Sequence, residues 1–270
     1  MRSNKILITL LFIFLAFNVS FSQSTSKKSS TKWKKHVALG IPTDSDSSDD
    51  FLIKRPQYVL SYNADKNVAN WISWNLNKRW YGKVKRWSGS FFKDPLLPWD
   101  VYKVKNSDYT NSGYDRGHMV RSEERTKTIT DNKSTFYLTN VLPQTADLNQ
   151  RLWLDLEYYC QTLCLDSLKE LYVMAGGVFH SGNRIDGVVS IPVSCFKIII
   201  VLEKGEGLSD VNANTEVIAV MMPNKDGLTD FDWKHYTTSI DRIEQSTGYD
   251  FLKNVDEDVQ KVIELKVYKE

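Results

Sequence analysis

Cysteine, histidine and net charge are all scarce in this chain. Its 270 residues include three cysteines and four histidines, and the formal net charge is only +2. An odd number of cysteines leaves at least one thiol unpaired even where disulfides are permitted. A charge so close to balance argues against a generally basic nucleic-acid coat protein. Any site for a polyanion must therefore be a local basic patch.

The three cysteines give little support to a metal centre. Cys160 and Cys164 lie four residues apart on one predicted helix, which is poor geometry for bonding to each other. A disulfide, if one forms, would join one of them to Cys195. A Cys-x3-Cys spacing with one distant cysteine is only a weak zinc signal. The chain also lacks an HExxH zinc motif and a nucleophile elbow around a serine.

Long apolar runs are also rare, and the first stands at the start of the chain. Residues 6–17 form an apolar run that follows a positive segment, and small residues stand after it at Ser20 and Ser22. This pattern predicts a secretory signal peptide, residues 1–22, cleaved before Gln23. The run is shorter than the ~20 residues of a membrane-spanning helix, and an uncleaved membrane anchor is the alternative. We expect a secreted or periplasmic protein with no membrane attachment after cleavage.

Removal of this peptide leaves a balanced chain. It takes away Arg2 and Lys5 and no acidic residue, so 33 basic and 33 acidic residues remain. Residues 23–36 are rich in Ser and Lys and are predicted to form a flexible lead-in. Residues 37–270 are long enough for one large domain, and the chain's 41% hydrophobic residues can build its core.

Segments rich in Val, Ile and aromatic residues predict a sheet. The predicted strands are 57–63, 70–76, 101–104, 135–140, 170–179, 194–203 and 215–224. One helix is predicted to begin at Leu148 with a capping box of Asp147 and Gln150, and another to end at Gly248. Strands and helices do not alternate strictly. This pattern favours an α+β domain around a mainly antiparallel sheet over a doubly wound fold.

A basic and aromatic segment, residues 77–87, stands between two predicted strands. Its basic residues are Lys78, Arg79, Lys83, Lys85 and Arg86. Two interpretations fit this composition equally well. The segment is either a solvated edge strand with half-buried aromatic rings or a surface that faces phosphate groups.

His118 lies in the segment YDRGHM, ahead of a predicted strand and the helix from Leu148, which together would form a ββα unit. On that helix Asn149 and Glu157 are about 80° apart around the axis, so both can face His118. A neutral imidazole can take a proton from water, and Arg116 can bind a phosphate oxygen. An asparagine oxygen suits a Mg²⁺ ion that keeps most of its waters. These groups fit metal-assisted hydrolysis of a phosphodiester.

Two longer segments, GYDRGHM and TFYLTNVLPQTADLNQRLWLDLE, resemble the DNA/RNA non-specific endonucleases of the ββα-metal (His-Me finger) class. Other segments, from ALGIPTD to TSIDRIEQSTGYDF, are similar to the same family in the same order, so the resemblance covers roughly residues 37–252. DRGH followed by N-Q-x6-E is a specific combination. The resemblance implies hydrolysis of DNA and RNA to 5′-phosphate products with a single Mg²⁺, for which Mn²⁺ is a substitute.

The resemblance also implies a role for each matching residue. His118 would be the general base that activates the attacking water, and Arg116 would steady the phosphate. Asn149 would be the one direct protein ligand of the Mg²⁺, and Glu157 would contact a metal-bound water. The motif's Asp115 and a downstream Asn140 match further family positions, and a purely structural role suits both of them nearly as well.

The chain departs from the family pattern at two places. The family usually has a small residue where Glu123 stands, and here Glu124 follows it as well. Acidic side chains near the cleft would repel phosphate or recruit a second cation. Many members carry an arginine where Gln161 stands, so one cation near the site is predicted to be missing. Activity is expected, in a weaker form.

We therefore expect an exported, metal-dependent endonuclease that cleaves DNA and RNA with a histidine base. The alternative is a catalytically weakened nuclease-fold protein that binds extracellular nucleic acid or a protein partner. It would bind without cleavage, with a strong salt dependence if the ligand is nucleic acid. A hydrolase for another phosphodiester is a third hypothesis, with the same site and a different pocket. The sequence carries no signal for the oligomeric state.

Overall fold

The computed structural model describes residues 31–180, 182–228 and 230–269. The predicted signal peptide and most of the predicted lead-in lie outside the described residues. The first described element is a 3-10 helix, Lys32–Val37. The prediction of a flexible lead-in is therefore wrong for its last residues, because His36 and Val37 are buried against the domain.

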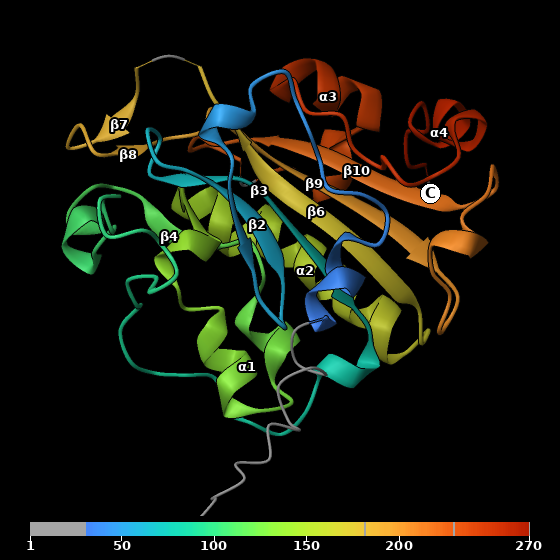
Figure 1. The fold of residues 1–270 in the computed structure, drawn as a ribbon, viewed down its shortest axis with the longest axis horizontal. Helices are drawn as coiled ribbons and strands as arrows, with labels where there is room; N and C mark the ends of the chain where they lie inside the picture. Colours follow the sequence, from blue (N-terminus) through green and yellow to red (C-terminus); the bar gives the residue numbers. More distant parts are fainter. Residues whose placement is uncertain (1–30, 181, 229, 270) are drawn as a thin grey trace, which may run out of the picture.

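A seven-stranded antiparallel sheet forms the centre of the domain (Figure 1). In spatial order its strands are β1 (Phe51–Lys54), β2 (Val59–Asn63), β3 (Val68–Leu76), β6 (Glu170–Val178), β9 (Ser194–Leu202), β10 (Glu216–Pro223) and β11 (Thr237–Thr238). Val, Ile and aromatic residues fill the central strands, and β3 and β6 are buried along their whole length. The α+β prediction with a mainly antiparallel sheet is confirmed.

Two smaller ribbons and four helices complete the regular structure. The ribbons pair β4 (Asp115–His118) with β5 (Val141–Gln144) and β7 (Arg184–Ile185) with β8 (Val189–Ser190). The helices are α1 (Ile129–Ser134), α2 (Trp153–Leu165), α3 (Ile240–Thr247) and α4 (Glu257–Ile263). Further 3-10 turns span Ser47–Asp49, Lys78–Trp80, Asn106–Tyr109, Ser122–Arg125, Leu138–Asn140, Leu208–Asp210 and Trp233–Tyr236.

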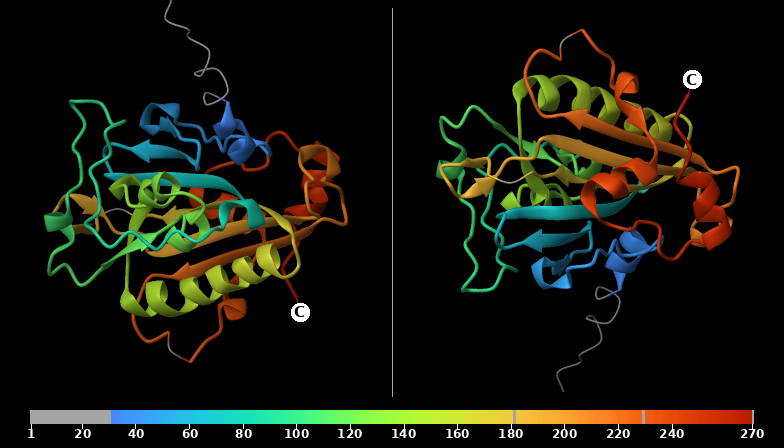
Figure 2. Two further views of the ribbon diagram at one scale, coloured as in Figure 1. Left: turned by 90° about the horizontal axis from the view of Figure 1, so that it is seen from below. Right: turned by 90° about the horizontal axis from the view of Figure 1, so that it is seen from above.

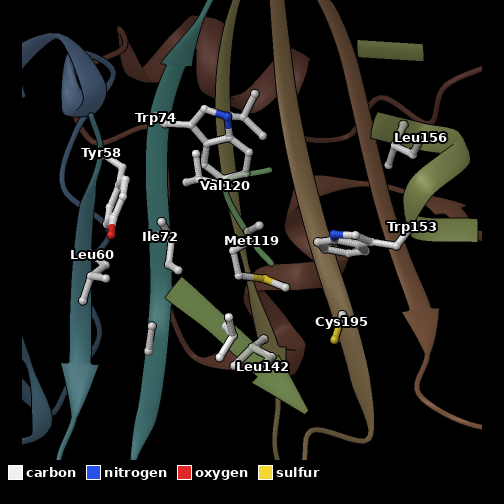
Figure 3. Close-up of a cluster of buried hydrophobic side chains, with 14 of the residues drawn as sticks. Tyr58, Leu60, Ile72, Trp74, Met119, Val120, Leu142, Trp153, Leu156 and Cys195 are labelled. Atoms are coloured by element: carbon white, nitrogen blue, oxygen red, sulfur yellow. The ribbon is translucent and has the colours of Figure 1, made fainter. Parts of the chain in front are cut away.

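One face of the sheet packs against the β4–β5 ribbon and α2. Figure 3 shows this core, in which side chains of β2 and β3 lie beside Met119 and Val120, which directly follow His118, and Trp153 of α2 lies near Cys195 of β9. The side chains concerned are Leu60, Ile72, Trp74, Met119, Val120, Leu142, Trp153 and Leu156. Burial of each large apolar side chain contributes about 1.5–3 kcal/mol. The core therefore fixes the positions of both β4 and α2 on the sheet.

The other face of the sheet carries the N-terminal segment together with α3 and α4 (Figure 2). Ile240 and Ile243 of α3 are fully buried there. As predicted, α3 ends at Gly248, which has a φ of 81°. Glycine takes this left-handed conformation at little cost, which makes it a common helix end. This face supports the sheet and carries none of the predicted site residues.

Three local predictions are wrong. Residues 101–104 form no strand, and the strand predicted at 135–140 is displaced to β5 with a 3-10 turn before it. The predicted capping box is absent, because Asp147 has helical backbone angles and its carboxylate accepts a hydrogen bond from the Gly227 amide instead. Thr145 is the residue whose carbonyl accepts from Asn149 and whose hydroxyl accepts from Leu148. Short apolar runs and capping signals cannot show which partner wins in the folded chain.

The three cysteines are all free and buried, so none of the conditional disulfides is formed in this structure. Burial raises the pKa of the Cys160 and Cys195 thiols to about 12. Such thiols are apolar packing groups rather than nucleophiles. Within the described ranges, no helix has the length and apolar character needed to cross a bilayer.

His36 predicts a measurable pH dependence of stability. Its Nδ1 accepts a hydrogen bond from the Asn75 amide and its Nε2 lies 2.8 Å from the Pro56 carbonyl, so the buried ring is neutral. Burial, with a smaller effect of Arg125, lowers its pKa from 6.5 to about 3. Below pH 6.5 the unfolded chain therefore binds more protons than the folded chain. The free energy of unfolding then falls as the pH is lowered, by up to about 1.4 kcal/mol per pH unit.

Denaturant unfolding of the wild type and of His36→Asn between pH 7 and pH 5 measures this effect. The wild type is expected to lose more stability than the variant over the interval. Buried carboxyl groups such as Glu264, whose pKa burial raises to about 8, act in the opposite direction in both proteins. The difference between the two proteins isolates the histidine, and parallel pH curves would contradict the prediction.

Candidate active site

The β4–β5 ribbon sets the direction of the DRGH side chains. His118 pairs with Val141 and Arg116 pairs with Pro143 in antiparallel register. Neighbouring residues on a strand point to opposite faces, so Arg116 and His118 share one face of the ribbon. Gly117 lies between them on the other face.

The helix that follows β5 begins with a wide turn. Residues Leu148–Leu152 form a π-helix that leads directly into α2. Such turns are often found at functional sites because they re-aim a side chain. The indole of Trp153 donates a 3.2 Å hydrogen bond to the carbonyl of His118, which ties the helix to β4. Asn149 is thereby brought beside the ribbon.

A cleft of about 590 Å³ opens where these elements meet. The side chains that line it are Arg86, Phe91, Asp115, Arg116, His118, Arg121, Ser122, Glu123, Asn149, Gln150, Leu154 and Glu157. Five of the six predicted site residues are therefore brought together. Asn140 is the exception. Three arginines and three acidic residues line the cleft.

His118 stands against aromatic rings at one wall of the cleft. Its ring lies 5.0 Å from that of Phe91 and 5.0 Å from that of Phe136, measured between centroids. Its Nε2 has no hydrogen-bond partner in the described part of the chain. Burial, followed by the positive charge of Arg86, lowers the pKa of His118 from 6.5 to about 3. The imidazole is therefore neutral at neutral pH, and its Nε2 is a buried atom.

Asn149 is oriented by the aspartate of the DRGH motif. Its Nδ2 donates a 2.9 Å hydrogen bond to Oδ2 of Asp115, and Gln150 donates a second bond of 2.8 Å to the same oxygen. An amide whose nitrogen is held in this way presents its oxygen in the opposite direction. Asp115 thus acts on the cleft by fixing the carboxamide of Asn149.

Glu157 is nearly buried at the floor of the cleft. Its Oε2 lies 3.4 Å from Nε of Arg121, and its Oε1 lies 3.8 Å from Nζ of Lys197. The second distance is too long for a hydrogen bond, and Oε1 has no such partner among the described residues. Burial raises the pKa of Glu157 to about 8, and the charge of Lys197 opposes that rise. With this pKa the group is mainly protonated at neutral pH, and a cation bound nearby would favour its charged form.

Arg116 reaches into the cleft from the same face as His118. Its Nη2 donates a 2.7 Å hydrogen bond to the carbonyl of Asn106, and its guanidinium lies 5.4 Å from the centre of the Tyr109 ring. Its Nε has no hydrogen-bond partner within the described segments. The guanidinium is therefore held in place at the cleft, which it lines.

Asn140 lies behind the ribbon and does not line the cleft. It is fully buried, and its side chain bonds to the backbone only: its oxygen accepts from the Val120 amide, and its nitrogen donates to the carbonyls of Val120 and Thr135. These bonds hold the chain just after His118. The position is that of a residue that orients its neighbours.

The two acidic residues that depart from the family pattern have different environments. Glu124 is buried and accepts a 2.9 Å hydrogen bond from the indole of Trp74, so it does not face the cleft as predicted. Glu123 does line the cleft, where it is paired with Arg86 at 3.5 Å and with Arg121 at 3.4 Å. Its charge is balanced by arginine, which the sequence did not indicate.

Sequence reasoning missed Arg121 and Lys197 and left Arg86 undecided. Residues 77–87 form a short 3-10 turn and no edge strand, and Arg86 is the basic residue of this segment that lines the cleft. Arg121 donates a 3.1 Å hydrogen bond to Gln161, so a guanidinium lies where a cation was predicted to be missing. Arg121 and Gln161 are forty residues apart, and no local pattern links them.

The glycine of DRGH predicts a sensitive substitution. A Cβ on Gly117 would lie 1.9 Å from Oε1 of Gln144, whose side chain is fully buried. Gly117→Ala must therefore displace the buried Gln144 side chain or shift β4, which carries His118 and Arg116. We expect a stability loss of about 1–3 kcal/mol from overpacking and, for a shift near 1 Å, a rate reduction of about 100-fold.

Gly113→Ala is the matched control for this substitution. Gly113 has a φ of 80° and nothing within 4 Å of a Cβ placed there, so the change strains the backbone without touching the ribbon. It is expected to cost about 1 kcal/mol and to leave the rate of cleavage unchanged. Equal rates for the two variants would contradict this account of Gly117.

Comparisons with known proteins agree with this geometry. A family model described as DNA/RNA non-specific endonuclease matches residues 36–258. A protein of Nostoc sp. named Nuclease is 44% identical over 86% of this chain and 85% of its own length. Mitochondrial endonuclease G of Bos taurus is 29% identical over 76% of this chain and 70% of its own length. In the crystal structure of the EndoG/EndoGI complex, a chain with 23% identity matches 83% of this chain and 93% of its own length with a TM-score of 0.69.

Proposed function

Because the chain belongs to the DNA/RNA non-specific endonuclease family, and is thus a nuclease, we propose that it is an exported endonuclease that cleaves both DNA and RNA. In this proposal His118 is the general base, a single metal ion bound at Asn149 assists it, and the products carry 5′-phosphates. The observation that supports it most is the cleft, which a neutral histidine lines together with an arginine, an oriented asparagine and a buried glutamate.

Nucleases of this family depend on a divalent metal ion, and the residues of the cleft fit one. The oriented carboxamide oxygen of Asn149 and the carboxyl group of Glu157 are hard oxygen donors, which Mg²⁺ and Mn²⁺ prefer. Asn149 would bind the ion directly, and Glu157 would hold a water attached to it. When bound, the ion would stabilise negative charge on the phosphate and the leaving 3′ oxygen.

The residues of the chain have separate tasks in this reaction. The imidazole of His118 takes a proton from a water, which then attacks the phosphorus atom. Arg116 binds a non-bridging oxygen of the same phosphate. Asp115 keeps the amide of Asn149 turned toward the cleft. The arginines of the cleft suit phosphate groups rather than base edges, so we expect little sequence specificity.

The direct test is to incubate purified residues 23–270 with plasmid DNA and with RNA, in Mg²⁺ and in EDTA. Cleavage of both polymers that is lost in EDTA is the expected result. The rate on a small phosphodiester is measured beside the rates on the two polymers. Faster cleavage of the small substrate would favour a hydrolase of another substrate class. Folded protein that binds nucleic acid but cleaves neither polymer with Mg²⁺ or Mn²⁺ would sink the proposal and favour the binding-protein alternative.

Export forms a separate part of the proposal. The apolar run of residues 6–17, with small residues after it, supports a signal peptide of residues 1–22. Expression of the full chain in a bacterial host, followed by N-terminal sequencing of exported protein, tests it. A mature terminus at Gln23 is expected. Full-length protein retained in the membrane fraction would instead identify the anchor.

A further inference from the structure

A carboxylate lies between two arginines at the rim of the cleft. Oε1 of Glu123 is 3.5 Å from Nε of Arg86, and its Oε2 is 3.4 Å from Nε of Arg121. Arg121 is two residues from Glu123 in the sequence, and the fold brings Arg86 to the same carboxylate. Two guanidinium groups on either side of one small anion are the arrangement that also binds phosphate.

Arg121 is built into this position. Its side chain is only 9% exposed, its Nη1 donates a 3.1 Å hydrogen bond to Gln161, and its guanidinium lies 4.4 Å from the centre of the Tyr158 ring. Glu157 provides a third contact at 3.4 Å. All three neighbours belong to α2. The guanidinium is therefore pre-oriented, and little conformational entropy is lost when it binds an anion.

Arg86 lies on the other side of Glu123, and its side chain is more exposed than that of Arg121, at 52%. Its Nε donates a 3.0 Å hydrogen bond to the hydroxyl of Ser122, and its guanidinium lies 5.0 Å from the centre of the Phe136 ring. The backbone beside it is fixed, because the Trp87 amide donates to Asn132. Both arginines thus keep their places if Glu123 leaves.

Glu123 itself is easily displaced. Its side chain is 39% exposed, and apart from the two arginines its one described hydrogen bond is from the hydroxyl of the adjacent Ser122, at 2.8 Å. A half-exposed ion pair contributes little to stability, so turning the carboxylate into solvent costs about 1 kcal/mol or less.

We infer that Arg86 and Arg121 form a second phosphate subsite of the cleft, and that Glu123 is an internal anion which a phosphate of the nucleic acid replaces. The inference rests on the proposed function, because it concerns a phosphate that neighbours the scissile one on the same strand. A substrate with a single phosphodiester would not reach the subsite. The carboxylate competes with the polymer and weakens its binding without taking part in the chemistry.

Binding of a fluorescent single-stranded oligonucleotide, measured in EDTA by anisotropy, tests the subsite without any cleavage. Glu123→Gln keeps the size of the side chain and removes the competing charge, so it should bind about fivefold more tightly at low salt. Glu203→Gln is the matched control. It makes the same change at an exposed carboxylate that is paired with Lys169 outside the cleft, and it should bind like the wild type.

A second pair of variants tests Arg121 itself. Arg121→Gln should weaken binding by about tenfold, because one phosphate contact is lost. Adding Gln161→Arg to this variant should restore most of the affinity. In the wild type the side chain of Gln161 accepts a hydrogen bond from Arg121, so an arginine at position 161 can place its guanidinium near the lost one. If Arg121 had only a structural role, an arginine introduced on α2 at position 161 would not restore the affinity. Thermal unfolding of each variant shows whether it is folded.

The outcomes separate the subsite from the nuclease. The subsite is wrong if the affinity of Glu123→Gln does not exceed that of the wild type, or if Glu203→Gln shows the same gain. This holds even when the wild type cleaves DNA. If Glu123→Gln binds more tightly and the double variant recovers affinity, the subsite stands even when no cleavage occurs. A wild type that never cleaves overturns the proposed function alone. In an active enzyme, KM for polymeric substrate should fall in Glu123→Gln while kcat is unchanged.

Discussion

His118→Ala is expected to lower the rate of DNA and RNA cleavage by about three orders of magnitude, near the middle of the range for loss of a general base. The imidazole lines the cleft and is neutral at neutral pH, as a general base must be before it takes a proton. Arg116 and the metal-binding residues stay in place in the variant, so it should still bind substrate. Initial rates on plasmid DNA and on RNA, in Mg²⁺, measure the loss.

His235→Ala is the control for this substitution. His235 packs against the ring of Phe231 at 4.6 Å and does not line the cleft, so its removal should leave the rate unchanged. Circular dichroism and denaturant unfolding of both variants establish that each is folded. Full activity in folded His118→Ala would show that another group is the base.

Asn149→Ala is expected to lower cleavage by about 100-fold or more at low Mg²⁺, because it removes the one residue proposed to bind the ion directly. Part of the rate should return as the Mg²⁺ concentration is raised, since Glu157 and the substrate phosphate would still hold the ion weakly. A titration of the cleavage rate with Mg²⁺ separates the loss of metal affinity from the loss of turnover. Calorimetric titration with Mn²⁺ measures the affinity without substrate.

Gln150→Ala is the matched control, because Gln150 and Asn149 donate to the same oxygen of Asp115. Its removal leaves Asp115 with one donor and leaves the carboxamide of Asn149 in place. We expect at most a few-fold change in rate and the same Mg²⁺ dependence as the wild type. If the two variants have the same Mg²⁺ dependence, Asn149 is not the metal ligand.

The sequence was sufficient to predict the class of fold and most of the cleft, for a physical reason. The ββα unit is local: β4, β5 and α2 follow one another within about fifty residues, and residues 115–157 carry all the predicted site residues. Period-2 and helical patterns then determine which side chains share a face. Long runs of Val and Ile similarly predicted β6, β9 and β10, which are central strands buried on both faces.

The predictions that failed depend on contacts between distant segments. Residues 101–104 have the composition of a strand, but no neighbouring strand pairs with them in the described ranges. Glu124 is an ordinary acidic residue by sequence. Only the fold shows that it is buried, where the indole of Trp74 donates a hydrogen bond to its carboxyl group. The cation near Gln161 could not be predicted from the sequence either, because Arg121 reaches α2 from the segment after β4.

The central claim is that His118 performs the chemical step in a metal-dependent cleft. The most direct measurement is the single-turnover rate of cleavage of a short labelled duplex in Mg²⁺, with wild type and His118→Ala each in saturating excess over the substrate. Binding is complete in both reactions, so the rate constant reports the chemistry alone. We predict a rate constant about 1000-fold lower for His118→Ala, in line with loss of a general base. Equal rate constants for the two folded proteins would contradict the claim.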